Sequence, residues 1–359
     1  MRRAALIVSL AGCTGSAPTG SGSDDAPTTM DAATTSDGSD PSTTTEPQDD
    51  DSGGTADGGT SHTDDSSGSS GSSGSGGPAR SLQYFGFVGV SCMVDDPDDE
   101  QGPRNYVDEI AGFTNLAHLC PLDIDITPQL DELHEAHLRA FVDLTLVLFE
   151  LVPGEAPVGS GSQLRLRPDA EQLFGAFVSE NPRLDSEHVG AFYLIDEPIW
   201  NGTPPEEIEA AAVLVEAAFP SIPSMVIEAY PVVDQAVFPD AVDWVGFDRY
   251  LVADPSSDPD YLADLETVRA RATPDQQLVI ILDAQWFSLH EMVPLTQEDM
   301  ANVAWHTYEL AASRDDVAAI IGYTWPGGLD LPQQLGARSL PPVVQQSYQD
   351  IGAQILEPR

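Results

Sequence analysis

Eight short apolar runs recur along residues 81–359, and each run is continuous rather than alternating. They lie at 84–90, 115–120, 140–149, 189–195, 224–230, 242–248, 277–283 and 318–325. A continuous apolar run is typical of a strand buried on both faces, as in a parallel sheet, whereas a half-exposed strand alternates. The pattern therefore predicts eight buried, parallel strands.

Amphipathic segments with helix start signals separate these runs. The clearest begin at Thr127, Thr203 and Thr296, where a threonine cap precedes an apolar face at helical spacing. Weaker helical patterns lie at 105–113, 168–180, 258–272 and 341–356, and the segment after Tyr230 is short.

Strands and helices that alternate eight times indicate an α/β fold closed into a single (β/α)8 TIM barrel. Residues 81–359 also suit the typical barrel size of about 250 residues. An open, doubly wound sheet is the alternative. We disfavour it because no glycine-rich phosphate loop follows any of the eight runs.

The first residues, MRRAALIVSLAGC, read as an export signal, with Arg2 and Arg3 before a short apolar stretch. The stretch is too short for a membrane-spanning helix, which needs about 20 apolar residues. The four residues LAGC resemble a bacterial lipobox. This resemblance implies a signal peptide over 1–12, cleavage before Cys13 and lipid attachment there. The protein is then exported and anchored by lipid to the bacterial cell envelope, at the outer membrane or cell surface.

Residues 13–80 are almost entirely Ser, Thr, Gly, Asp, Pro and Ala. Such a segment cannot bury enough apolar surface to offset its conformational entropy, so we expect a disordered tether before the barrel domain of 81–359. Twelve of the 59 acidic residues and three of the 14 basic residues precede position 81, which leaves 47 acids against 11 arginines. A domain with a net charge near −36 repels nucleic acid and anionic lipid, so we do not expect either as a partner.

Active sites of (β/α)8 barrels lie at the carboxyl ends of the strands, and here those ends carry acids and aromatic side chains. Along the chain they are Cys92, Glu150, Asp196, Glu197, Glu228, Tyr230, Asp248, Tyr250, Asp283, Gln285, Trp286, Tyr323 and Trp325. Carboxyl groups transfer protons, and flat aromatic faces stack on sugar rings. The composition of this edge therefore predicts a carbohydrate site.

The sequence FYLIDEP, at the end of the fourth run, resembles the general-acid position of the large clan of cellulase-type barrel glycoside hydrolases, where Asn-Glu-Pro is usual. The resemblance implies hydrolysis of O-glycosidic bonds in an oligo- or polysaccharide, with Glu197 as the proton donor. It also implies Tyr250 as a rim tyrosine and Trp325 as an aromatic platform. We expect the other rim side chains to contact the substrate: Glu228, Asp248, Trp286 and Tyr323.

Two departures from that clan leave the mechanism open. Asp196 replaces the usual Asn, and LDAQWF places Asp283 where the clan has a nucleophilic Glu. The shorter Asp283 favours an inverting enzyme or loss of the reaction, which would leave a glycan-binding barrel without activity. Alternatively, Asp196 and Glu197 resemble the pair of substrate-assisted hexosaminidases, in which Asp orients the acetamido nucleophile and Glu is the acid.

Structural roles are the alternative for each of these residues. Glu197 and Asp283 can cap a turn, Asp248 can pair with Arg249, and the two tryptophans can pack in the core. The histidines lack HxxxH or HxH spacing, and no serine is flanked as GxSxG, so we expect no metal, no cofactor and no serine nucleophile. We expect a monomer, with its membrane contact through the lipid alone.

Cys92 and Cys120 end the first and second predicted strands, and therefore lie at adjacent strand ends. In an exported protein such cysteines are candidates for a disulfide.

Overall fold

The computed structural model describes residues 81–152 and 163–357. The predicted signal peptide, the lipidation site at Cys13 and the tether lie outside these residues. Within the described residues, no helix is long and apolar enough to cross a membrane.

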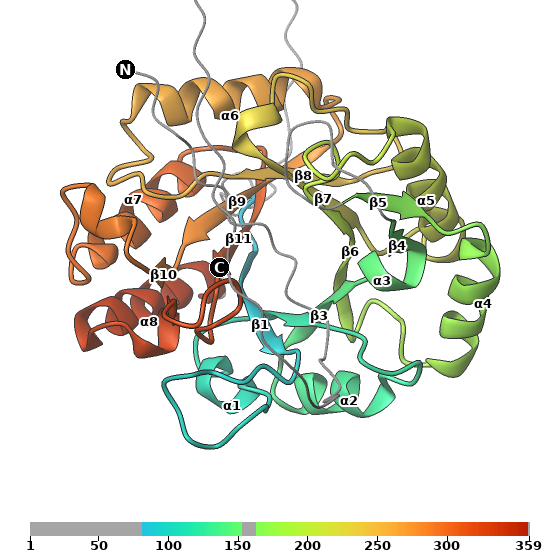
Figure 1. Ribbon diagram of the computed structural model, residues 1–359, viewed down its shortest axis with the longest axis horizontal. Helices are drawn as coiled ribbons and strands as arrows, with labels where there is room; N and C mark the ends of the chain where they lie inside the picture. Colours follow the sequence, from blue (N-terminus) through green and yellow to red (C-terminus); the bar gives the residue numbers. More distant parts are fainter. Residues whose placement is uncertain (1–80, 153–162, 358–359) are drawn as a thin grey trace, which may run out of the picture. The chain divides into compact units, whose positions relative to one another are not determined.

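Eight parallel strands close into a barrel, with helices around the outside (Figure 1). The order around the barrel is β1, β11, β9, β8, β7, β6, β3, β2. The strands are β1 (Tyr84–Ser91), β2 (Leu116–Leu119), β3 (Arg139–Asp143), β6 (Val189–Asp196), β7 (Ser224–Ala229), β8 (Trp244–Asp248), β9 (Gln277–Asp283) and β11 (Val317–Tyr323). The predicted (β/α)8 barrel is confirmed.

Seven of the eight α-helices in the described residues follow the predicted segments, with ends that differ by a few residues, whereas the helix Thr145–Leu148 lies within the run 140–149 that was predicted as a strand. They are α1 (Val107–Ile110), α2 (Thr127–Glu135), α3 (Thr145–Leu148), α4 (Ala170–Glu180), α5 (Pro205–Ala218), α6 (Pro259–Arg271), α7 (Met300–Ala312) and α8 (Pro342–Leu356). The short segment after β7 forms one 3-10 turn, η1 (Tyr230–Val232), and two more are η2 (His290–Met292) and η3 (Ala337–Ser339). Two small antiparallel pairs lie outside the barrel sheet: β4 (Phe149–Leu151) with β5 (Leu164–Leu166), and β10 (Gln285–Trp286) with β12 (Leu335–Gly336).

The continuous apolar runs are explained by two separate cores. Along β9, Val279 and Ile281 belong to the core inside the barrel, whereas Leu278, Ile280 and Leu282 pack in the core beneath the helices. Both faces of each strand are therefore buried, and no polar position interrupts the run. Gly246 on β8 is required by close packing, because a Cβ atom there would lie 2.6 Å from the carbonyl oxygen of Val279.

The third strand is shorter than the sequence predicted. It ends at Asp143, whose carboxylate accepts a hydrogen bond from the Thr145 amide (2.8 Å) and so turns the chain into α3. Glu150, expected at this strand end, lies instead on β4, where its half-exposed carboxylate is 3.8 Å from Arg167. A local hydrogen bond to a side chain thus ends the strand at Asp143, whereas the apolar pattern alone predicted a strand up to residue 149.

Candidate active site at the barrel mouth

Two neighbouring cavities open at the carboxyl ends of the strands, and we call them together the mouth. Asp248, Tyr250 and Asp330 line both cavities. Asp196 lines the first cavity, and Glu197 lines the second. The first is the larger of the two, with about 1160 Å³ of space when the part open to solvent is counted, against about 540 Å³ for the second.

Glu197 is the most deeply buried acid of the mouth. Its side chain is 1% exposed, and among the described residues its Oε2 atom has no hydrogen-bond partner. Its backbone has φ 41°, in the left-handed region that residues other than glycine rarely adopt, while its amide donates to Ile227 (2.9 Å). Such backbone strain is concentrated at functional sites. Burial, and then the charges of Asp248 and Asp196, raise the pKa of Glu197 well above its ordinary value.

Asp248 faces Glu197 from the end of β8, and the two carboxyl groups lie within hydrogen-bonding reach. The Tyr250 hydroxyl donates to Asp248 across 3.3 Å. Burial raises the pKa of Asp248 to about 6, against the opposing effect of the hydrogen bonds with Glu197 and Tyr250. The alternative pairing with Arg249 is wrong, because the Arg249 guanidinium binds Asp264 instead.

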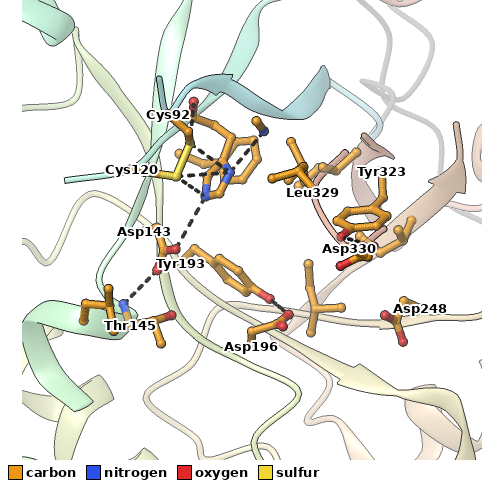
Figure 2. Close-up of a pocket in the computed structure, with 18 of the residues that line it drawn as sticks. Cys92, Cys120, Asp143, Thr145, Tyr193, Asp196, Asp248, Tyr323, Leu329 and Asp330 are labelled. Atoms are coloured by element: carbon orange, nitrogen blue, oxygen red, sulfur yellow. Dashed lines mark hydrogen bonds and ion pairs between the residues drawn. A yellow bond between two sulfur atoms is a disulfide. The ribbon is translucent and has the colours of Figure 1, made fainter. Parts of the chain in front are cut away.

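Asp196 ends β6 and accepts a hydrogen bond from the Tyr193 hydroxyl, as Figure 2 shows. Burial raises the pKa of Asp196 well above its ordinary value. The hydrogen bond from Tyr193 opposes this shift, and the negative charges of Asp248 and Asp143 add to it. Asp196 and Glu197 are thus two adjacent acids that both favour the protonated form.

Asp330 is a mouth acid that the sequence analysis missed. It lies in the loop after β11 and accepts hydrogen bonds from the Tyr323 hydroxyl (2.6 Å) and from Gln334 (3.0 Å). Burial raises its pKa, although both hydrogen bonds oppose the shift. The signal in the sequence was weak, because this acid lies in a Gly- and Pro-rich loop, five positions after the last apolar run ends at Trp325. We name Asp196, Glu197, Asp248 and Asp330 the mouth carboxyls.

The far side of the first cavity carries Asp143 and the sulfur atoms of Cys92 and Cys120 (Figure 2), and His118 also lines this cavity. The two cysteines form a disulfide that joins the ends of β1 and β2. The His118 ring stacks on Phe141 (4.7 Å between centroids) and lies 3.7 Å from the Asp143 carboxylate. Burial favours the neutral acid, but the contacts with His118 and Thr145 together outweigh it and lower the pKa of Asp143.

Cys92, His118 and Cys120 are also the one group of three potential metal ligands found within the described ranges. Their ligand atoms lie within 4.8 Å of one another. Because the two sulfur atoms are bonded to each other, neither is a thiolate, the form in which cysteine binds metals.

Two predicted site acids bind backbone amides and are not among the residues that line the mouth. Glu228 accepts from the amides of Ile199 (2.8 Å), Trp200 (3.2 Å) and Ala229 (2.9 Å), so it fixes the loop after β6. Burial raises the pKa of Glu228 to about 8, against the effect of these three donors.

Asp283 uses its Oδ2 atom to accept from the Leu251 amide (2.8 Å) and to contact His290 Nε2 (3.1 Å). Its Oδ1 atom is buried and has no partner among the described residues. Asp283 therefore holds the loop after β8 with one oxygen and leaves the other free.

The predicted aromatic residues also fall into two groups, those that line the mouth and those that pack elsewhere. Tyr250 and Tyr323 line the mouth as a tilted pair with centroids 5.6 Å apart. Trp325 packs edge-on against Phe87, and its indole N–H donates to Glu109 (2.8 Å). Trp286, 8% exposed, stacks on His290. The tyrosines are available to a ligand, whereas the two tryptophans pack in the outer core and do not line the mouth.

No protein-family model and no curated protein matches the sequence. Solved structures of glycoside hydrolases do resemble the fold. A β-glucuronidase from an uncultured Clostridium sp. has a TM-score of 0.51 at 10% identity, covering 76% of this chain and 50% of the other. Xylanase 10B from Thermotoga maritima has a TM-score of 0.48 at 14% identity, covering 78% and 97%.

A GH113 β-1,4-mannanase has a TM-score of 0.46 at 12% identity, covering 76% of this chain and 98% of the other. At such identities the likeness concerns the fold. The chain folds as a barrel of the kind found in glycoside hydrolases.

Proposed function

We propose that the protein hydrolyses O-glycosidic bonds at the barrel mouth, with Glu197 as the general acid. The observation that supports this most directly is the state of Glu197. It is buried at the carboxyl end of β6, its pKa is raised, and it has an unpartnered oxygen beside the cavity. A general acid must carry its proton near neutral pH and present it to the substrate, and these features suit both needs.

In the proposed reaction, Glu197 gives its proton to the glycosidic oxygen as the bond from that oxygen to the anomeric carbon breaks. Water supplies a hydroxyl group to the anomeric carbon, and its remaining proton passes to a carboxylate. The products are two sugars, each ending in a hydroxyl group. Asp248, within hydrogen-bonding reach of Glu197, helps to keep the proton on Glu197 before substrate binds.

The second carboxyl group distinguishes two mechanisms. Under the two-carboxylate mechanism, Asp283 acts through its free Oδ1 atom. Under the substrate-assisted mechanism, Asp196 orients an acetamido group of the sugar from its place in the lining of the mouth. Asp283→Asn should lower the hydrolysis rate severely under the two-carboxylate mechanism and mildly under the substrate-assisted mechanism. Asp196→Asn should show the reverse.

A glycan-binding barrel without activity is the second candidate. It is favoured by Asp283, which does not line the mouth and whose Oδ2 atom is held by Leu251 and His290. Tyr250 and Tyr323 supply stacking faces for a sugar whether or not the sugar is cleaved.

Hydrolysis and binding assays on one panel of oligosaccharides separate the two candidates. We expect the wild type to cleave at least one glycan, and Glu197→Gln to bind that glycan without cleaving it. Glu150→Gln is the matched control, because it makes the same substitution on a half-exposed acid of β4. Binding without cleavage by the wild type would support the inactive barrel, and unchanged cleavage by Glu197→Gln would refute the general acid.

We also propose that the mature chain begins at a lipidated Cys13, which anchors it to the bacterial envelope. The support is the LAGC sequence after a short apolar stretch. Cys13→Ser should move the protein out of the membrane fraction or block its processing. Wild-type protein with an unmodified mature mass would contradict the anchor.

A further inference from the structure

We propose that the sugar bound at the mouth carries a protonated amine, so that the preferred substrate is a glycan of free-amine hexosamine units. This proposal rests on the proposed function in its two-carboxylate form, because a free amine lacks the acetamido group of the substrate-assisted mechanism. It adds the chemical class of the substrate. Five carboxyl groups line the mouth, and an ammonium group consists only of hydrogen-bond donors.

Most of the carboxyl and amide acceptors that line the mouth come from β3, β6, β8, β11 and the loops that follow them. These are the mouth carboxyls, Asp143 at the end of β3, and the side-chain oxygen of Asn201. Among the described residues that line the two cavities, none is an arginine, and the chain contains no lysine. The nearest candidate for a cation is His118, which lies beside Asp143.

Three tyrosine hydroxyl groups of the mouth are already used as donors. Tyr193 donates to Asp196, Tyr250 donates to Asp248, and Tyr323 donates to Asp330. Each of these tyrosines therefore turns its donor toward an acid and offers no second O–H group to a ligand. The hydroxyl group of Thr145, which lines the first cavity, has no partner among the described residues. Beside the three acids, a ligand has to bring its own donors.

Three acceptor atoms on side chains that line the mouth lack a donor in the part of the chain that the structure describes: Glu197 Oε2, Asn201 Oδ1 and Asp330 Oδ1. The first two belong to side chains that are 1% and 3% exposed. Glu197 lines the second cavity and Asn201 lines the first. A buried polar atom without a partner costs about 1 to 3 kcal/mol, so these atoms indicate a ligand with hydrogen-bond donors.

Charge selects an ammonium group over a neutral or acidic one. Asp196, Asp248 and Asp330 lie together along one part of the cavity, across from the disulfide (Figure 2). Burial raises the pKa values of Asp196, Asp248 and Asp330, and repulsion from neighbouring acids adds to the shift at Asp196 and Asp248, so protons neutralise part of this charge while the site is empty. A bound ammonium group takes over that neutralisation and releases protons. A uronic acid or a sulfated sugar meets like charges instead.

A bare metal ion fits this arrangement less well than a sugar. Among the described residues, one group of three side chains has potential metal-ligand atoms within 4.8 Å of one another: Cys92, His118 and Cys120. None of the mouth carboxyls belongs to this group. These acids are spread around a cavity whose walls include Ile227, Ile281 and Ile321. Apolar walls with acceptors at the edges suit a ring with C–H faces and an amine at its edge.

Calorimetry on Glu197→Gln, which cannot act as the proton donor, tests the inference with three matched β-1,4-linked oligosaccharides. They contain glucosamine, N-acetylglucosamine or glucose. We expect the glucosamine oligomer to bind about tenfold more tightly than the other two, and to lose this preference at high salt. Its binding should also release protons, which appears as a heat that depends on the buffer.

Adding Asp330→Asn should reduce the amine preference, measured as the ratio of glucosamine to glucose oligomer affinity, to about threefold or less. Asp350→Asn, an exposed acid on α8, is the matched control and should keep the full preference. Equal binding of the three oligomers, or a preference that survives Asp330→Asn, would overturn the inference. Tight binding of Ca²⁺ or Mg²⁺ without sugar that is lost in Asp330→Asn would overturn it in favour of a metal site.

The outcomes also separate this inference from the proposed function. If the wild type cleaves neutral glycans without an amine preference, Glu197 is supported as the acid and the ammonium subsite is refuted. If the wild type binds the glucosamine oligomer selectively but does not cleave it, the subsite is supported and the hydrolase is refuted.

Discussion

Two acidic clusters lie at the carboxyl end of the barrel, and they differ in whether arginine accompanies the acids. The mouth carboxyls have no arginine among the residues that line the cavities. The second cluster, which we call the rim cluster, lies between the loops that follow β1 and β11. It combines three acids with two arginines: Asp96, Asp99, Glu109, Arg104 and Arg338.

The rim cluster shows what these acids do when cations are close. Arg338 contacts both Asp96 and Glu109 at 3.0 Å, and Arg104 contacts Glu109 at 2.9 Å. Burial acts against the charged form, but the hydrogen bonds from Arg338 and Trp325 prevail and lower the pKa of Glu109. At the mouth, burial without a cation shifts pKa values in the opposite direction. The same residue type thus serves stability at the rim and holds protons at the mouth.

The largest expected effect comes from making one substitution in both clusters. Glu197→Gln should lower the hydrolysis rate by about 10²- to 10⁴-fold and leave the melting temperature unchanged or higher, because it removes a proton donor and no ion pair. Glu109→Gln should leave the rate per folded molecule unchanged and lower the melting temperature, because it weakens the contacts with both arginines. Steady-state kinetics and thermal melts on both variants check this. If the two variants showed similar changes in rate and melting temperature, the proposed difference between the mouth carboxyls and the rim cluster would be wrong.

Arg338→Met should lower the free energy of unfolding by about 2 to 4 kcal/mol, because it leaves the fully buried Asp96 without its cation. Arg338→Lys is the control: it keeps the charge but not the forked contact with Glu109, so a smaller loss is expected. Urea unfolding measures both values. A loss below about 1 kcal/mol for the methionine variant would class the rim cluster with ordinary surface ion pairs.

Asp248→Asn should stabilise the protein at high pH by about 1 to 3 kcal/mol and have little effect near pH 4. The pKa of Asp248 is raised from its ordinary 3.8 to about 6. Its contribution to stability is therefore complete below about pH 4 and is lost as the pH rises through about 6. Unfolding free energies at both pH values check the prediction. A destabilised variant at high pH would show that the Asp248 charge has a cation partner in the folded state.

The smallest effect is expected in the pH profile of the wild type. The raised pKa values of Asp248, at the mouth, and of Glu228, which does not line it, remove stability as the pH rises from about 4 to 8. The lowered pKa of Glu109 removes stability as the pH falls below its ordinary 4.5. The melting temperature should therefore be highest near about pH 5. Asp248→Asn should flatten the high-pH side, and Glu109→Gln the low-pH side; a profile that neither variant changes would contradict both assignments.

The sequence by itself determined the barrel and the position of Glu197. Continuous apolar runs arise because each strand is buried on two faces, and helical spacing with start signals marks the segments between them. Both patterns are local and can be read residue by residue. Because the carboxyl ends of all strands meet at one edge, Asp196 and Glu197 at the end of a run were sufficient to locate the mouth.

Only the tertiary structure decided which acids and aromatic residues reach the mouth. Asp330 reaches it from a loop without periodic signal, whereas Asp283 is held by Leu251, 32 positions earlier in the chain. Glu228 is held by the amides of a loop almost as distant in sequence, and Trp325 by Glu109, 216 positions away. A side chain at a strand end turns toward the partner that satisfies its polar atoms. These partners come from distant segments, so the direction of the side chain is fixed only when the whole barrel has closed.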